Sequence, residues 1–292
     1  MRKIIQFLGL CLLLYGIGSY FYPVVMTDKL EKETVTYVKE VDQAYKQNKK
    51  KKTDPQKDPF FRSIQRYNQT IYENGQKDFK DAFSYTWFPI PLDGFKDERC
   101  GYIKIPAMDV ELPLYVRATK ENMAKGAAVL GNTSIPIGGN NTNAVIAAHR
   151  GYQGIPYFRE IEKLGKGDKV IIKNKWQKLT YRVDSIKIIY PDESDEVKIQ
   201  PGKDMLTLLT CHPYRSGGKY RYLVYCVRDK GSSKKTTQKK KKKTVETTKE
   251  ISFVSSEADI KREDQLRAAT FLFLCICVLY VLIKKISYRR KR

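Results

Sequence analysis

Histidine is scarce in this chain: His149 and His212 are the only two among 292 residues. Any chemistry that needs an imidazole therefore has two residues to choose from. Acidic residues are also few, with 32 Asp+Glu against 55 Lys+Arg and a formal net charge of +23. This balance excludes an acidic solvating protein and leaves nucleic acid, anionic polymers and membrane surfaces as partners to consider.

Cysteine is too sparse in the middle of the chain for a disulfide-stapled scaffold. Of the 6 cysteines, half lie in apolar segments near the two ends, and Cys100, Cys211 and Cys226 remain. Three scattered thiols do not form a disulfide framework. A single Cys100–Cys226 disulfide stays possible, and Cys211 is the thiol best placed to react.

An apolar segment begins the chain. Residues 4–26 carry no charge, and at about 1.5 Å per residue they are long enough to cross a bilayer. Arg2 and Lys3 precede them, which favours a cytoplasmic N-terminus. We expect residues 1–27 to be a membrane anchor; a cleaved signal peptide is the alternative, although no clear small-residue cleavage site follows the apolar run.

A second apolar segment lies near the other end, at residues 268–283, and a basic tail follows at 284–292. The segment is short but adequate for a transmembrane helix whose basic flank extends to the interface. The basic tail indicates a cytoplasmic C-terminus. We therefore expect a protein of the cell membrane, with both termini cytoplasmic and residues 28–267 extracellular.

Between these segments the composition changes twice. Residues 28–80 are charged, and helical spacing from 61 to 80 predicts an extracellular helical arm. Residues 81–228 contain short runs rich in Val, Ile, Leu, Tyr and Thr that are broken by Gly, Pro and Asn. These runs are 102–105, 127–130, 144–148, 169–172, 179–183, 186–190, 205–210 and 222–227. They predict a mainly β sandwich or barrel with one helical turn near 155–164, followed by a disordered basic linker at 229–267.

Three predicted strand ends carry residues suited to acyl transfer. One strand ends at Cys211, a second ends at His149, and a third begins with Arg221, ten residues after the cysteine. A hairpin would bring Cys211 and Arg221 together at one end of a sheet. A thiolate could attack a carbonyl, a histidine could protonate the leaving amine, and a guanidinium could stabilise the oxyanion. This chemistry needs no metal and no cofactor, and the Cys–His spacing is not a zinc pattern.

His212 is adjacent to Cys211, yet His149 is the better candidate base. Neighbouring side chains of an extended strand point to opposite faces, so His212 should point away from the thiol. The structural alternatives are that His149 caps a strand end and that Cys211 is a small buried apolar residue.

These residues resemble those of a known family. The Thr-Leu-Leu-Thr-Cys at 207–211, the Ala-Ala-His-Arg-Gly at 147–151 and the strand that begins with Arg221 together look like a sortase. Sortases are membrane-anchored cysteine transpeptidases of Gram-positive bacteria. The order His, Cys, Arg also matches, and the resemblance spans about residues 58–228.

Within the family the chain is most similar to class C, the pilin polymerases. The histidine is followed by Arg-Gly, and a second membrane segment ends in a basic tail. Asp58-Pro59-Phe60 is similar to the Asp-Pro-aromatic signature of the class C lid, and residues 66–68 look like the helix that follows that lid.

The resemblance implies an eight-stranded β-barrel with short helices. It implies that Cys211 cleaves the Thr–Gly bond of a Leu-Pro-x-Thr-Gly-like sorting signal, with His149 as acid and base and Arg221 as oxyanion stabiliser. Thr210 and Leu209 would line the substrate groove. The thioacyl enzyme would pass the pilin or surface protein to a lysine amine, or alternatively to the amine of a cell-wall precursor.

The lid also has a physical interpretation. Asp58 could pair with Arg221, Phe60 could cover the Cys211 sulfur, and Pro59 would stiffen the bend between them. The alternative is that Asp58 and Pro59 merely cap the helix that follows.

Other readings stay open at this point. The loop at 212–219 is about one residue longer than expected, which makes Arg215 the alternative to Arg221. The chain could also be a housekeeping sortase acting on peptidoglycan, a cysteine hydrolase, or a non-catalytic membrane-tethered scaffold. Nucleic-acid binding is disfavoured because the basic runs lie beside the membrane segments and no recognition motif is present.

Overall fold

The computed structural model describes residues 2–76, 94–152, 155–231, 245–247, 251 and 253–290. The chain divides into two units, Met1–Phe253 and Val254–Arg292, and each is described by itself. The expected boundary between the helical arm and the β domain, at residues 80 and 81, lies outside the described residues.

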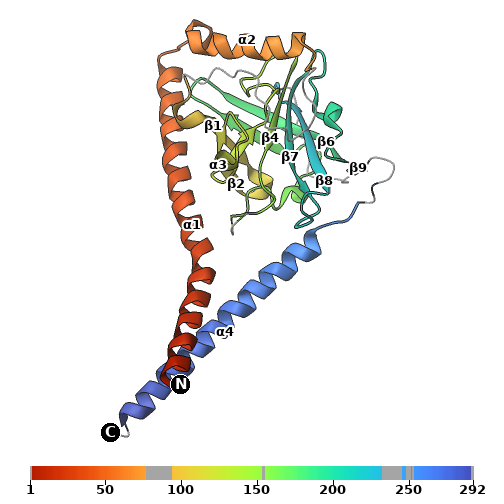
Figure 1. The fold of residues 1–292 in the computed structure, drawn as a ribbon. Coiled ribbons are helices and arrows are strands. Elements are labelled where there is room, and N and C mark those ends of the chain that lie inside the picture. The colour runs from red at the N-terminus through yellow and green to blue at the C-terminus, as the bar shows by residue number, and fades with distance from the viewer. Residues whose placement is uncertain are drawn as a thin grey trace. The chain divides into compact units, whose positions relative to one another are not determined.

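Eight strands of the first unit close into a barrel (Figure 1). They are β1 (Arg99–Ile105), β2 (Val110–Tyr115), β3 (Ala127–Val129), β4 (Thr142–Ala147), β5 (Lys169–Lys173), β6 (Lys178–Ile189), β7 (Asp204–His212) and β8 (Tyr220–Arg228). Their order is β5-β1-β2-β3-β4-β7-β8-β6, and β6 pairs back with β5. Two neighbouring pairs, β2–β3 and β4–β7, are parallel. The predicted mainly β, eight-stranded barrel is confirmed.

Strands β4 and β7 are buried on both faces, which explains why they read as continuous apolar runs rather than alternating ones. Leu206 and Leu208 face the main barrel core. Met205, Leu209 and Val145 face a second, smaller core on the other side of the sheet. Packing on both sides holds this strand pair firmly, and the candidate thiol lies at its end.

The strands differ from the predicted runs in two places. The runs 179–183 and 186–190 form the single strand β6, interrupted by a bulge between Val183 and Ser185. Strand β2 was not predicted, because Pro113 divides its short apolar sequence. Short helical segments complete the connections: η1 (Pro55–Lys57), η2 (Lys96–Glu98), η3 (Pro106–Met108), α3 (Lys120–Met123), η4 (Ile161–Lys163) and η5 (Ser194–Val197). The helical turn expected near 155–164 corresponds to η4.

Helix α1 (Arg2–Lys50) runs without a break through the expected boundary between the N-terminal segment and the helical arm. Its C-terminal half packs on the barrel through Tyr37 and Val41, which contact Tyr102. Asp42 accepts a hydrogen bond from the Tyr102 hydroxyl at 2.8 Å and pairs with Lys173 at 2.7 Å. These contacts attach α1 to β1 and β5.

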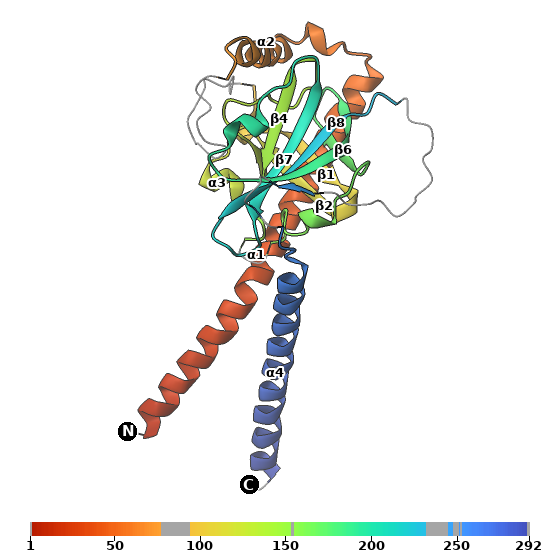
Figure 2. The same ribbon diagram turned by 90° about the vertical axis from the view of Figure 1, so that its right-hand side faces the viewer.

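Helix α2 (Pro59–Glu73) lies across the end of the barrel where β4 begins (Figures 1 and 2). Its apolar face packs on Ile135 and Ile137 in the segment before β4. The Asn68 amide donates to the Ile135 carbonyl at 3.0 Å and accepts from the Ile135 N–H at 2.8 Å. A helix side chain therefore satisfies backbone groups that the barrel leaves unpaired.

The expected disordered linker at 229–267 contains ordered structure where it is described. Strand β9 (Val245–Thr247) pairs in parallel with β6, and Ile251 is buried in the main core. In the second unit, helix α4 (Glu257–Arg290) begins before the predicted membrane segment. None of the helices, judged on the described residues, combines the length and the apolar character that a membrane span requires.

Candidate active site

The three candidate catalytic residues share one row across three adjacent strands. The parallel register of β4 and β7 pairs Ala147 with Leu209. Continued by two residues, this register places His149 beside Cys211. The antiparallel register of β7 and β8 pairs Cys211 with Arg221. Side chains in one row of neighbouring strands point to the same face, so the three groups converge at one end of the barrel.

Gly218 shows how closely the thiol and the guanidinium approach. A methyl group at Gly218 would lie 3.3 Å from Cys211 Sγ and 3.1 Å from Nη1 of Arg221. Arg221 Nη1 also donates to the Gly218 carbonyl at 2.5 Å. The φ of +85° at Gly218 is a conformation that side-chain-bearing residues rarely adopt. A positive charge therefore lies where a thiolate or an oxyanion would carry negative charge.

His149 lies in an aromatic setting at the end of β4. Its ring stacks on Tyr152 with 4.6 Å between centroids and meets Tyr157 edge-on at 6.2 Å. Burial lowers the pKa of His149 below its ordinary value. The imidazole is therefore mainly neutral at pH 7 and able to accept a proton.

Thr210 and Leu209 do not form an open groove. Leu209 is fully buried in the second core. Thr210 is also buried, and its hydroxyl donates to the Ala148 carbonyl at 2.8 Å. The expected substrate-lining role is therefore replaced by a structural one: these residues attach β7 to the end of β4, directly before His149.

The side chain of His212 points into the protein, as alternation along the strand predicts. It is 1% exposed, and its ring packs against Tyr222 and stacks on Phe253. Cys211, one residue earlier, is partly exposed. His212 therefore lies on the opposite face of β7 from the thiol.

The lid candidates lie elsewhere. Asp58 accepts hydrogen bonds from Trp176 Nε1 at 2.8 Å and from the Phe60 N–H at 2.9 Å, and Lys175 is 3.7 Å away. Phe60 packs on Phe95 and Trp176. Burial alone would raise the pKa of Asp58, but these hydrogen bonds outweigh it and hold the pKa below its ordinary value.

The expected contacts of Asp58 with Arg221 and of Phe60 with the Cys211 sulfur are therefore absent from the described structure. Asp58 is the N-cap of α2, and Pro59 occupies its first turn. Asp-Pro is a local start signal for a helix, and here that local role explains the motif.

Arg215 does not replace Arg221. It is exposed in the loop between β7 and β8, has a φ of 59°, and extends over the Tyr214 ring at 5.8 Å. Arg221, in contrast, is held on a strand in register with Cys211.

The other mid-chain cysteines are free and buried, so the possible Cys100–Cys226 disulfide is wrong. The Cys100 thiol donates to the Leu114 carbonyl. Burial raises the pKa of both thiols, which leaves them protonated and unreactive.

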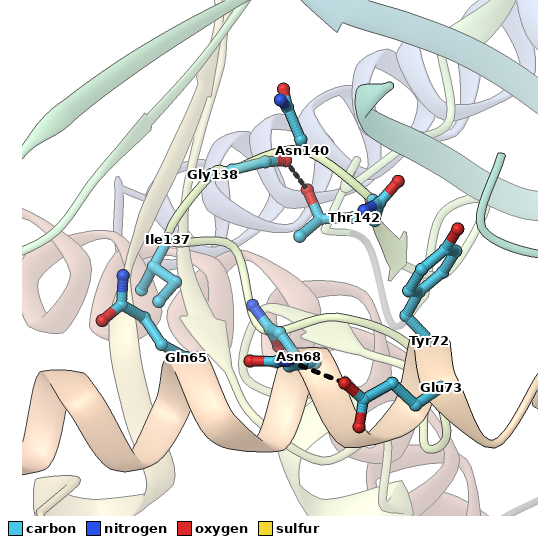
Figure 3. Close-up of a pocket in the computed structure, with 11 residues that line it drawn as sticks. Gln65, Asn68, Tyr72, Glu73, Ile137, Gly138, Asn140 and Thr142 are labelled. Atoms are coloured by element: carbon cyan, nitrogen blue, oxygen red, sulfur yellow. Dashed lines mark hydrogen bonds between the residues drawn. The ribbon is translucent and has the colours of Figure 1, made fainter. Parts of the chain in front are cut away.

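A pocket of about 370 Å³ lies at the opposite end of β4, between α2 and residues 137–142 (Figure 3). Asn68, Gln65 and other amide side chains line it, and Glu73, its one charged lining residue, accepts a hydrogen bond from Gln69 at 2.7 Å. The lining holds no thiol and no imidazole. It therefore offers neither a cysteine nucleophile nor a histidine base for acyl transfer. Among the described residues, no cluster of His, Cys, Asp and Glu could hold a metal ion.

Sequence reasoning missed a polar network beneath the thiol. Arg150 forms an ion pair with Glu162 and approaches Nδ1 of His212. The signal that could have identified the network is that Arg150 and His212 each follow a candidate catalytic residue, so both must point inward.

Comparisons with known proteins agree with this arrangement. The sortase domain model matches residues 103–229, which include the whole row. Sortase A of Staphylococcus aureus is 31% identical over 155 residues, covering 52% of this chain and 71% of that protein. Clostridium perfringens sortase C, solved with the C-terminal cell wall sorting motif, is 35% identical with a TM-score of 0.51, covering 58% of this chain and 87% of that one.

Sortase C1 of GBS pilus island 1 is 28% identical with a TM-score of 0.58, covering 68% of this chain and 98% of that one. The similarity in sequence and in fold thus extends over the barrel and the row of His149, Cys211 and Arg221. The chain belongs to the sortase family of cysteine transpeptidases.

Proposed function

We propose that this chain is a pilus-assembling sortase that joins pilin subunits through a lysine isopeptide bond. The observation that carries the proposal is the shared row, in which Cys211 and Arg221 pair on β7 and β8 and His149 follows the end of the adjacent strand β4. The similarity to sortase C structures, one of them from a pilus island, supports the pilin assignment.

The first step would be acylation of the thiol. Cys211 Sγ passes its proton to the neutral His149 and attacks the threonine carbonyl of a Leu-Pro-x-Thr-Gly-like signal, and Arg221 stabilises the oxyanion that forms. The C–N bond to glycine breaks, and His149 donates the proton that the leaving amine needs. The C-terminal part of the signal leaves, and a thioester remains on Cys211.

The second step would be transfer to an amine. A lysine amine of a second pilin attacks the thioester carbonyl and gives a proton to His149. The C–S bond breaks, the Cys211 sulfur takes the proton back from His149, and an amide remains between the two proteins. No oxidant, metal or cofactor takes part in this sequence.

We also propose that the chain is anchored at both ends, with residues 28–267 outside the cell. The proposal rests on the uncharged segment at 4–26, the apolar segment at 268–283 and the basic residues that flank them. Protease added to intact cells tests it. It should remove the barrel while epitopes at both termini stay protected, and exposure of either terminus would contradict the proposed topology.

A second candidate is a housekeeping sortase that uses the amine of a cell-wall precursor. The match to Staphylococcus aureus sortase A favours it. The two candidates differ only in the acceptor, so identification of the product separates them.

The test is incubation of the full chain, in detergent, with a pilin domain that carries the sorting signal. We expect a covalent pilin ladder whose linking lysine is identified by mass spectrometry, and we expect Cys211→Ala to form none. Linkage only to an added peptidoglycan precursor would overturn pilin polymerisation in favour of the housekeeping candidate.

A further inference from the structure

A second polar row lies directly behind the catalytic row. Arg150 follows His149, His212 follows Cys211, and the register of β4 and β7, continued beyond its last pair Ala147–Leu209, places the second pair side by side as it does the first. Alternation turns both side chains inward. Arg150 is 5% exposed and His212 is 1% exposed. Charged groups are rarely buried to this degree unless they are paired.

The Arg150 guanidinium joins three parts of the site. Its Nη1 donates to the backbone carbonyl of Cys211 at 3.3 Å and lies 2.7 Å from Nδ1 of His212. Its Nη2 forms an ion pair with Glu162 in η4. The side chain that follows the candidate base thus holds the backbone of the candidate nucleophile.

The distances assign the protonation state of His212. A guanidinium offers only donors, so Nδ1 at 2.7 Å must be the acceptor. The Glu162 oxygen is 3.6 Å from the same nitrogen, which is too far for a hydrogen bond. His212 is therefore the neutral tautomer with its proton on Nε2, and it acts as an acceptor for Arg150.

We propose that Arg150 is a positioning residue of the transpeptidation. It attaches the end of β4 to the end of β7, through the Cys211 carbonyl and the His212 ring, and so sets the separation of His149 and Cys211. Glu162 holds the guanidinium in place. The inference rests on the catalytic roles proposed for Cys211 and His149, but not on pilin as the substrate.

The geometry distinguishes Arg150 from a generic buried cation. The planar guanidinium directs Nη1 toward the Cys211 carbonyl and His212 and directs Nη2 toward Glu162 at once. An ammonium is a point charge on a flexible stem and cannot reproduce this fork. Arg150→Lys should therefore keep the charge and still lose part of the positioning.

The test compares the full-length wild type with Arg150→Lys, Arg150→Met, His212→Asn and His212→Leu. Cleavage of a sorting-signal peptide gives kcat and KM, and iodoacetamide labelling of Cys211 across pH gives a readout that needs no substrate. We expect Arg150→Met to lower kcat about 100-fold, the scale of a misplacement near 1 Å, with KM little changed. Arg150→Lys should fall between Arg150→Met and the wild type.

The two His212 variants separate a positioning role from a packing role. The Asn side chain can place an oxygen near the former Nδ1, so His212→Asn should retain most of the kcat, and His212→Leu should lose it. The pH profile of Cys211 labelling should change in Arg150→Met and His212→Leu and stay near wild type in His212→Asn. Should Arg150→Met fail to fold, Arg150→Lys and the two His212 variants decide whether Arg150 positions the site.

Arg182→Met is the matched control. Arg182 is a partly buried arginine paired with Asp229 at 2.8 Å, on β6 and remote from the row. The Arg182→Met substitution should lower the unfolding temperature and leave kcat and Cys211 labelling unchanged. An unchanged kcat and labelling profile in folded Arg150→Met would overturn the proposal, as would equal losses in Arg182→Met. If the wild type labels but cleaves no sorting peptide, the proposed function fails, and the labelling profiles still test Arg150.

Discussion

The two ends of the parallel pair β4–β7 differ in what their side chains do. Where the strands begin, amides from α2 satisfy backbone groups, as Asn68 does for Ile135. Where the strands end lie His149 and Cys211, the residues proposed to carry out acyl transfer. Parallel strands finish at the same edge of a sheet, so two distant segments deliver their terminal residues to one place. One end of the pair supports the fold, and the other holds the residues proposed for the chemistry.

The supporting end is held by hydrogen bonds as well as by packing. Gln76 donates to the Asn132 carbonyl at 2.7 Å and accepts from the Ile199 N–H at 2.7 Å. Together with Asn68, this residue attaches α2 to two loops of the barrel. Substitutions here should therefore affect stability, and substitutions at the other end should affect rate.

Cys211→Ala should abolish the transfer activity proposed for the end of the β4–β7 pair that carries His149 and Cys211. We expect transfer to fall by about 10⁴-fold or more, as for the loss of other covalent nucleophiles, since no second reactive thiol lies in the row. The unfolding temperature should stay close to that of the wild type because Cys211 is partly exposed. Peptide cleavage and a thermal melt check the two halves of this prediction, and a large stability loss would contradict it.

Asn68→Ala should destabilise the fold at the end where β4 and β7 begin. The Ile135 N–H and carbonyl would lose their partner in a buried setting, at a cost of about 2–4 kcal/mol. Urea unfolding measures this change, and kcat measured on the fraction that stays folded should equal that of the wild type. A lower kcat at full stability would mean that the two ends are coupled.

Asp58→Ala sharpens the comparison because Asp58 was the expected lid residue. It removes an N-cap and the bond to Trp176, so we expect a loss of about 1–2 kcal/mol. Iodoacetamide should label Cys211 at the wild-type rate, because Asp58 contacts neither Cys211 nor Arg221. Faster labelling would restore the lid hypothesis.

The smallest expected effect concerns pH. Burial lowers the pKa of His149, so the acidic limb of kcat/KM should lie below about 6.5, the ordinary value of histidine. Tyr152→Ala removes the stacked ring, which exposes His149 and should move this limb upward toward that value. NMR titration of the two histidines checks the assignment directly, and an unmoved limb would show that Tyr152 does not shield His149.

Much of the fold and of the site could be predicted because it depends on local features. Short β-rich runs predicted a mainly β sandwich or barrel, and the family resemblance narrowed this to an eight-stranded barrel. Cys211, His149 and Arg221 stand out because each is a polar residue at a strand end. Alternation along β7 was enough to choose His149 over His212.

The rest depends on contacts between distant segments. The parallel register of β4 and β7 joins residues 62 positions apart. The sequence of neither segment indicates that it pairs with the other. The Arg150–Glu162 pair and the burial of Thr210 follow from that register. The sequence could not separate a lid from a helix cap at Asp58, because one short motif fits both, and the contact of Asp58 with Trp176 is tertiary.

The most direct test of the shared row is intact mass spectrometry of the full chain mixed with a Leu-Pro-x-Thr-Gly peptide. The wild type, Cys211→Ala and His149→Ala are compared, with hydroxylamine added at the end to cleave thioesters. We predict a hydroxylamine-sensitive adduct in the wild type, far less in His149→Ala and none in Cys211→Ala. An adduct that persists in Cys211→Ala would contradict the account, because the nucleophile would then lie outside the row.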